Sequence, residues 1–277
     1  LRGATHAVAK LSAEEKARGV VGVSTGNHGR GLAHAARAAG VRCVICMSRL
    51  APRVKIDGIA AEGAEVRIVG RSQDEAQEEV DRLVAEEGMT MIPPFDHRDV
   101  IAGQGTLGLE LLEDVPDLET VIVPVSGGGL VSGVAAAVKA QHPGTRVVGV
   151  SMERGAAMHA SLAAGRPVLV EELPTLADAL GGGIGLDNRH TFAMTRALVD
   201  DLVLVDERAI ARAIRHAFHA EGETVEGSGA VGIAALATGR VRSDGPVAIL
   251  LTGANGDPEQ HRRIVAGEDV DVTGEAA

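Results

Sequence analysis

Short apolar runs, often β-branched, alternate along this chain with stretches whose apolar residues recur at helical spacing. A run of four to eight apolar residues is typical of a buried strand, and apolar residues three and four apart are typical of one side of a helix. Their alternation predicts an α/β fold in which parallel sheets are flanked by helices. We expect strands at residues 20–23, 41–47, 65–69, 121–125, 146–150, 202–205 and 247–251.

The most regular helical stretch covers residues 73–87. Ser72 and Glu75 form the S-x-x-E pattern of a capping box, in which two side chains bind N–H groups at a helix start. Gly88 follows the stretch, and glycine is common just after a helix end. The sequence therefore predicts a helix over residues 73–87.

A loop almost without side chains, Ser-Gly-Gly-Gly at residues 126–129, separates the predicted strand 121–125 from a helix-like run at 130–140. Its glycines allow positive φ angles and let backbone N–H groups approach a ligand closely. The dipole of the following helix adds attraction for an anion. We interpret the loop as a phosphate cradle, with a tight turn that binds nothing as the alternative.

A second glycine loop, S-T-G-N-H-G-R-G at residues 24–31, follows the predicted strand 20–23. Its glycine spacing differs from the G-x-G-x-x-G of dinucleotide sites, and the next strand ends in Ser48 and Arg49 where those sites have an acidic residue. A dinucleotide site is therefore disfavoured. The hydroxyls, amide and imidazole of the loop suit a small polar substrate with a carboxylate, next to a cofactor that has a ring.

These loops belong to an ordered set of motifs that resembles the pyridoxal-phosphate enzymes of the threonine dehydratase and serine racemase family, the fold-type-II group related to the tryptophan synthase β chain. Residues 1–4 are similar to the tail of the family's F-K-x-R-G-A segment, and residues 24–28 to its S-x-G-N-H loop. Further matching segments follow in the family's order at residues 94–96, 101–106, 126–130, 176–178, 225–230 and 251–255. The runs at 94–97, 151–159 and 181–188 most resemble hydroxyectoine-utilisation dehydratases.

The resemblance implies a two-domain fold, because these enzymes insert a small domain into a larger cofactor-binding domain. The small domain would comprise residues 20–98. The large pyridoxal-phosphate domain would comprise residues 1–19 and 99–277, together with an N-terminal part that precedes Leu1.

The resemblance also implies which residues bind the cofactor. The phosphate would be bound by backbone groups of Ser126, Gly127, Gly128, Gly129 and Leu130. Asn27 would hydrogen-bond the ring hydroxyl, Thr252 would face the pyridine nitrogen, and Glu226 would lie near the ring. A hydroxyl can donate to a neutral pyridine nitrogen, whereas a carboxylate would favour the protonated ring. This partner favours elimination of a β-hydroxyl over transamination.

The substrate carboxylate would be bound by Ser24, Thr25, Asn27 and His28, where the dipole of the following helix favours an anion. Thr25 would also be the candidate catalytic residue, since racemases of this family place a serine there as an acid and many dehydratases place alanine. A hydrogen bond within the loop is its alternative role. Ala179 stands where many relatives have glycine.

The lysine of F-K-x-R-G-A, which carries the cofactor in the family, would fall immediately before Leu1. The four lysines of this chain have other neighbours and are interpreted as surface residues: Lys10, Lys16, Lys55 and Lys139. We therefore expect the lysine in a segment that precedes Leu1. A protein without it could bind the cofactor but would lack the nucleophile.

The implied reaction is a β-elimination on a hydroxy amino acid by a pyridoxal-phosphate-dependent ammonia-lyase, or dehydratase, which gives a 2-oxo acid and ammonia. Breakdown of hydroxyectoine is one pathway it fits. The alternatives are a serine or threonine racemase and a cofactor-binding regulatory protein that lacks the lysine. The resemblance also implies a homodimer.

Charge and composition exclude several other partners. The formal net charge of −11 and the sequence pI near 5.4 argue against nucleic acid and against an anionic membrane surface. No apolar run reaches the length of a membrane span, and no secretory signal is recognisable, so we expect a cytoplasmic protein.

Metal and redox sites are not predicted. Relatives with a divalent-cation site have an acidic pair where this chain has Ser151 and Ala157. His216 and His219 have helical spacing but lack a placed third ligand. Cys43 and Cys46 fall within one predicted strand, where residues three apart point to opposite faces.

Overall fold

The computed structural model describes residues 1–24, 26–51, 53–71, 73–268, 270 and 272. The chain forms two compact units, Leu1–Gly103 and Gln104–Ala277, and each is described by itself. The contacts of residues 1–19 place them in the first unit, whereas the family resemblance assigns them to the larger domain. That assignment stays a prediction.

The first unit contains a parallel sheet with the strand order β3-β2-β1-β4. Its strands are β1 (Val20–Val23), β2 (Cys43–Met47), β3 (Glu65–Ile68) and β4 (Thr90–Met91). Its helices are α1 (Arg2–Lys10), α2 (Ala13–Arg18), α3 (Asn27–Ala38), α4 (Arg53–Ala61), α5 (Gln73–Glu87) and the start of α6 (Arg98–Asp114). Three of these strands were predicted, and β4 was missed because two residues are too few to show a period.

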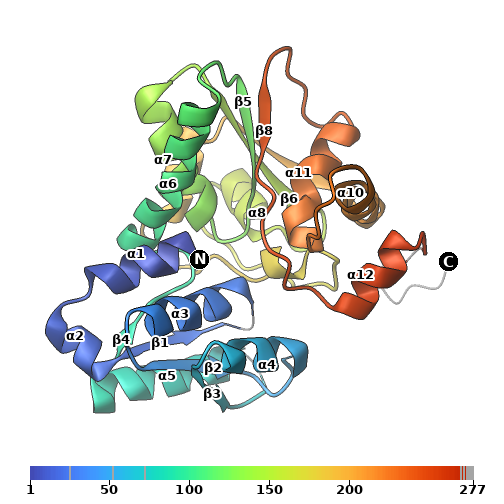
Figure 1. The fold of residues 1–277 in the computed structure, drawn as a ribbon. Helices are drawn as coiled ribbons and strands as arrows, with labels where there is room; N and C mark the ends of the chain where they lie inside the picture. The colour runs from blue at the N-terminus through green and yellow to red at the C-terminus, as the bar shows by residue number, and fades with distance from the viewer. Residues whose placement is uncertain (25, 52, 72, 269, 271, 273–277) are drawn as a thin grey trace. The chain divides into compact units, whose positions relative to one another are not determined.

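Each face of this sheet packs on its own set of helices, which Figure 1 shows for α3 and α5. One apolar cluster joins α1, α3 and α4 to Cys43 and Ile45, and another joins α5 to Val44 and Cys46. The two thiols therefore point to opposite faces, as predicted. Burial raises the pKa of Cys43 to about 12 and that of Cys46 to about 11.

The predicted helix over residues 73–87 is confirmed, since α5 has these bounds. Ser72 lies outside the described residues, so its part in a capping box is untested. Glu75 accepts a hydrogen bond from the N–H of Arg71 at 2.7 Å. A capping box that was not predicted begins α2, where Ser12 and Glu15 each bind the other's backbone N–H.

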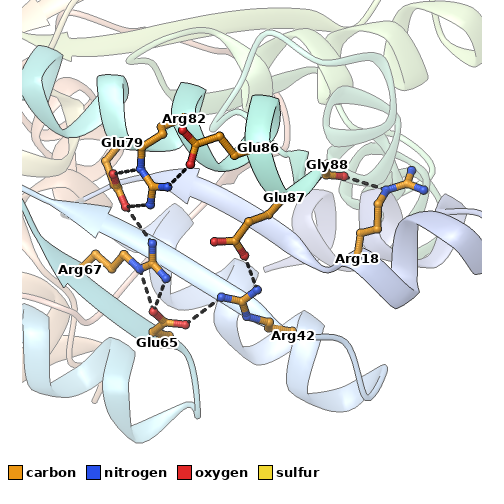
Figure 2. A network of polar contacts seen from close by, with 9 residues as sticks. All are labelled: Arg18, Arg42, Glu65, Arg67, Glu79, Arg82, Glu86, Glu87 and Gly88. Carbon is orange, nitrogen blue, oxygen red and sulfur yellow. Dashed lines mark hydrogen bonds and ion pairs between the residues drawn. The ribbon is translucent and has the colours of Figure 1, made fainter.

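A network of arginines and glutamates joins Arg42, just before β2, to β3 and α5 on the surface of this unit (Figure 2). Glu79 of α5 is its centre, with Arg67 of β3 and Arg82 of α5 at 2.7 and 2.8 Å from its Oε1. Hydrogen bonds from Arg82, and then from Arg67, lower the pKa of Glu79 to about 2. The network ties the edge of the sheet to the helix that covers it.

The second unit contains another parallel sheet, with the strand order β7-β6-β5-β8. Its strands are β5 (Thr120–Pro124), β6 (Arg146–Met152), β7 (Asp201–Val205) and β8 (Val247–Ile249), which confirms the four predicted there. The remaining elements are α7 (Gly129–Gln141), α8 (Ala157–Ala164), a 3₁₀ turn (Asp178–Leu180), α9 (Thr191–Leu198), α10 (Glu207–Ala220), α11 (Gly227–Ala237) and α12 (Pro258–Val265).

Helices cover both faces of this second sheet. One apolar cluster joins α10 and α11 to alternate residues of the central strands, such as Ile122 and Val148, and includes Ile264 of α12. The other joins α7, α8 and α9 to Val121 and Val123. Because a parallel sheet is buried on both faces, its strands form the continuous apolar runs by which they were predicted.

Candidate active site

Two loops that carry predicted site residues leave neighbouring strands of the second sheet at the same edge. β5 and β8 are paired in parallel with Ile122 opposite Ile249, and the N–H of Leu250 donates to the Ile122 carbonyl at 3.0 Å. Ser126 and Thr252 follow these strands by similar distances along the chain, so they lie at adjacent carboxyl ends. Ligands of open α/β sheets bind at this edge.

Gly128 is the N-cap of α7 and has φ +88° and ψ −3°, a left-handed conformation that favours glycine. A Cβ at this position would lie 2.7 Å from Met158 Cε and 3.0 Å from Thr191 Cβ. The first N–H groups of a helix have no acceptor within it, and here they follow a turn without bulky side chains. This arrangement of N–H donors at the positive end of a helix dipole fits a dianionic phosphate.

Buried hydroxyl groups of α7 and α9 pack next to the phosphate cradle. Ser132 Oγ lies 3.4 Å from Thr195 Oγ1, and both residues are almost fully buried. Asn188 donates to Thr191 Oγ1 at 2.8 Å and accepts from the Phe192 N–H at 2.9 Å. Ser132, Thr191 and Thr195 were not predicted from the sequence, because single hydroxyl residues about sixty positions apart produce no periodic pattern.

Ser126 also connects the cradle to the glycine-rich stretch at 181–185, since its Oγ donates to the Gly181 carbonyl at 3.5 Å. Next to that stretch, Ala179 lies in the 3₁₀ turn, and its N–H donates to Ser228 Oγ at 3.0 Å. Ser228 belongs to the first turn of α11. The segment around Ala179 and Gly181 is thus bound on both sides, to the phosphate loop and to α11.

Thr252 and Glu226 lie close to each other in the second unit. Thr252 is half-buried, and no hydrogen bond of its hydroxyl is found to any residue that the structure describes. Glu226 is 6% exposed and immediately precedes α11. Its Oε2 accepts a hydrogen bond from the Asn255 N–H, in the segment that follows Thr252. The structure therefore brings together these two and the phosphate loop in one unit.

In the first unit, Ser24 and Asn27 lie where β1 ends and α3 begins. Ser24 is buried, and its Oγ accepts hydrogen bonds from the N–H groups of Gly26 at 3.2 Å and Gly29 at 3.1 Å. These two hydrogen bonds fix the shape of the loop between β1 and α3. Thr25 lies outside the described residues, so its predicted role is untested.

His28 is half-buried in the first turn of α3, and its Nε2 lies 2.9 Å from the Ile92 carbonyl, just after β4. A carbonyl can only accept, so Nε2 carries the proton. Loss of solvent around the ring lowers the pKa of His28 to about 4, although the bond to Ile92 acts in the opposite direction. The ring is thus neutral near pH 7 and joins α3 to β4. Its predicted contact with a substrate carboxylate stays a prediction.

Leu1 lies against the same helix: a Cβ on Gly31 would be 3.4 Å from the Leu1 nitrogen. Leu1 and the start of α1 therefore lie beside α3 in this unit.

The histidine pair considered for a metal makes other contacts. His216 lies 3.2 Å from Glu221, and His219 Nε2 lies 2.9 Å from the Val265 carbonyl. In the part of the chain that the structure describes, no three His, Cys, Asp or Glu side chains are grouped as metal ligands. Within the same part, no helix has the length and apolar character needed to cross a bilayer.

Two all-parallel sheets flanked by helices, with a glycine cradle at a strand's carboxyl end, define the class as fold-type-II α/β enzymes that use pyridoxal phosphate. The family model for pyridoxal-phosphate dependent enzymes matches residues 1–253. The chain therefore belongs to this family, it is an enzyme, and its cofactor is pyridoxal phosphate.

The similar proteins are dehydratases and racemases by name. A Sinorhizobium fredii protein with the provisional name threonine dehydratase is 58% identical over 268 residues, which cover 96% of this chain and 81% of the relative. The L-threonine ammonia-lyase of Thermotoga maritima is 43% identical over 265 residues, 96% of this chain and 66% of the relative. The structure of maize serine racemase matches with a TM-score of 0.89 at 35% identity, over 95% of this chain and 80% of that one.

Proposed function

We propose that this protein is an ammonia-lyase that performs β-elimination on a β-hydroxy amino acid and releases a 2-oxo acid and ammonia. The Cα–H and Cβ–O bonds break, water leaves, and hydrolysis of the resulting enamine gives the two products. No oxidant or reductant is needed. Threonine is the first substrate to test, because the Sinorhizobium and Thermotoga relatives are named for it. An amino acid derived from hydroxyectoine is the second.

The observation that carries the proposal is the pairing of a phosphate cradle with a hydroxyl at the next strand end. Ser126 follows β5, Thr252 follows β8, and the two strands are hydrogen-bonded neighbours. Bound pyridoxal phosphate supplies an electron sink for negative charge at the substrate Cα. A threonine hydroxyl donates to the ring nitrogen without providing a negative charge that would stabilise its protonated form. Weaker delocalisation favours expulsion of a β-hydroxyl.

The phosphate is assigned to the backbone N–H groups of the cradle: Ser126, Gly127, Gly128, Gly129 and Leu130. They are fixed by a turn in which Gly128 is tightly packed on the protein side. Their geometry therefore exists before the ligand binds, which lowers the entropy lost on binding.

The substrate carboxylate is assigned to the loop at the start of α3. Ser24 is oriented by two backbone N–H groups, and Asn27 is the first residue of the helix, where the dipole favours an anion. Asn27 is also assigned to the ring hydroxyl of the cofactor. The neutral His28 fixes the start of the helix to Ile92 and provides no charge to the carboxylate.

A racemase is the second candidate, and the similarity to maize serine racemase favours it. Racemisation needs an acid on the opposite face of the substrate from the base, and Thr25 is the residue proposed for it.

A homodimer and a cytoplasmic location remain predictions as well. Light scattering of the full-length protein tests the first.

The decisive experiment incubates the full-length protein and pyridoxal phosphate with L-threonine, L-serine and a hydroxyectoine-derived amino acid. We expect 2-oxo acid and ammonia in equal amounts and little D-isomer on chiral chromatography. Dominant D-isomer would establish the racemase instead. If the protein binds pyridoxal phosphate but forms neither 2-oxo acid nor D-isomer, the lyase and the racemase activity are both refuted. A regulatory protein would then be favoured.

Thr252 variants test the step that selects elimination. Thr252→Ser keeps a hydroxyl at the ring nitrogen and should keep most of the lyase activity. Thr252→Asp introduces a carboxylate and should shift the ratio of products away from 2-oxo acid formed by elimination. Equal ratios in the two variants would contradict the role given to this hydroxyl.

A further inference from the structure

Glu226 makes two hydrogen bonds with the short turn that follows Thr252. Its backbone N–H donates to the Gly253 carbonyl at 3.1 Å, and its Oε2 accepts from the Asn255 N–H at 3.2 Å. Gly253 has φ +62°, a left-handed conformation that favours glycine. Both ends of the turn are therefore held by one residue, through its main chain at one end and its carboxylate at the other.

The carboxylate is committed to this turn although Glu226 occupies a helix N-cap. No hydrogen bond runs from its side chain to the first turn of α11. Glutamate is a poor capping residue, because Ser, Thr, Asp and Asn have the side-chain length that reaches N2 or N3. The residue is also 6% exposed, and a buried carboxylate without compensating hydrogen bonds is strongly destabilising. The Asn255 N–H supplies one such hydrogen bond to the Glu226 carboxylate.

The start of α11 is pressed directly against Thr252. A Cβ on Gly229 would lie 1.8 Å from the Thr252 carbonyl oxygen, and one on Gly227 would lie 2.1 Å from the Leu176 carbonyl oxygen. Only glycine permits these approaches. The Thr252 backbone is therefore packed against α11, and the residues that follow it are bound by Glu226.

We propose that Glu226 is a positioning residue that fixes the Thr252 hydroxyl for the pyridine nitrogen of the cofactor. The proposal rests on the function proposed above and assigns Glu226 a role through the 253–255 turn instead of direct contact with the ring. Without the carboxylate, the Asn255 N–H loses this acceptor and the turn gains freedom. The Thr252 hydroxyl then becomes ordered at the pyridine nitrogen only when the cofactor binds. Because this ordering costs free energy, the cofactor binds more weakly, and the surroundings of its pyridine ring change.

Three variants separate this role from general damage. Glu226→Ala removes the acceptor, Glu226→Asp keeps the charge but withdraws the carboxylate by one methylene, and Glu226→Gln keeps an acceptor oxygen without charge. The matched control is Thr145→Val, which removes another buried hydrogen bond of this unit, from Thr145 Oγ1 to the Leu118 carbonyl at 2.8 Å. Thr145 immediately precedes β6, at the opposite strand ends from Thr252.

The readouts are the dissociation constant for pyridoxal phosphate and the pH dependence of the visible absorption of the bound cofactor, with urea unfolding of the apoprotein. We expect Glu226→Ala and Glu226→Asp to weaken binding by roughly tenfold, the effect of losing one hydrogen bond, and to shift the absorption profile. Glu226→Gln should restore both properties, and Thr145→Val should lower stability without changing either.

The positioning role would be overturned if Glu226→Asp and Glu226→Ala had the wild-type dissociation constant for pyridoxal phosphate and the wild-type absorption profile. So would a Glu226→Gln variant as weak as alanine, because charge and not the acceptor would then be needed, or a Thr145→Val variant with the same loss of binding. A wild-type protein that does not bind pyridoxal phosphate would refute the proposed function itself, which is a different result.

Discussion

Replacing Gly128 by alanine tests the phosphate cradle at the point where the structure restricts it most. Gly128 has φ +88°, and an added Cβ would lie 2.7 Å from Met158 Cε, 3.0 Å from Thr191 Cβ and 3.1 Å from Thr195 Oγ1. The methionine end is flexible and can move away. The β-branched threonines on α9 are fixed by their own packing, and both are almost fully buried.

Two penalties add in this variant. An L-residue in the left-handed region is disfavoured by roughly 1–2 kcal/mol, and forcing extra atoms into a packed interior is disfavoured by roughly 1–3 kcal/mol. We therefore expect the free energy of unfolding to fall by about 2–5 kcal/mol. The turn can relieve the contacts only by moving its N–H groups, so affinity for pyridoxal phosphate should fall as well.

Gly239→Ala is the matched control, because Gly239 has φ +70° and no atom lies within 4 Å of its added Cβ. It should show the backbone penalty alone, about 1–2 kcal/mol, with unchanged cofactor affinity. Urea unfolding and titration with pyridoxal phosphate measure both quantities. If Gly128→Ala and Gly239→Ala lose the same stability, packing around Gly128 does not restrict the turn. If Gly128→Ala binds pyridoxal phosphate as tightly as wild type, the loop does not bind its phosphate.

Three further predictions concern charge and exposure in the first unit. The pKa of His28 is lowered from 6.5 to about 4, so the folded state should lose stability as pH falls from 6.5 toward 4, and His28→Gln should lack this part of the wild-type pH dependence in urea titrations. Glu79→Gln should lower the free energy of unfolding by about 1 kcal/mol in low salt and less in high salt, because it breaks two ion pairs, whereas Glu86→Gln, with an exposed side chain and one pair, should have a smaller effect. The thiols of Cys43 and Cys46 should not react with a disulfide reagent at neutral pH until urea unfolds the protein; fast reaction of the native protein would contradict their burial and raised pKa values.

Most of the fold was predictable because buried parallel strands produce a local signal. Of the eight strands in the part of the chain that the structure describes, seven were predicted, and their apolar runs reflect burial on both faces. Ends were shifted by a residue or more, as at β2, which begins at Cys43 and not at residue 41. The missed strand, β4, has only two residues and is defined by its pairing with β1, a long-range contact that the sequence does not display.

The site was predictable only where glycine or an ordered motif marks it. The glycines at 127–129 were expected to allow positive φ angles, and Gly128 has one. Ser132, Thr191 and Thr195 were missed because ordinary hydroxyl residues become a support only when α7 and α9 pack together. The environment of His28 was missed too, since its partner is the backbone carbonyl of Ile92, and a carbonyl is present at every position.

The packing around Gly128 also shows why a glycine motif alone cannot distinguish a cradle from a bare turn. The groups that exclude a Cβ, from Met158, Thr191 and Thr195, all lie on the protein side of the turn. Either kind of turn would therefore require glycine and would lose stability in the alanine variant. What differs is the use of the N–H groups beside Thr252. Stability reports on the packing and cofactor affinity reports on the donors, so the two must be measured on the same variant, and only the second bears on function.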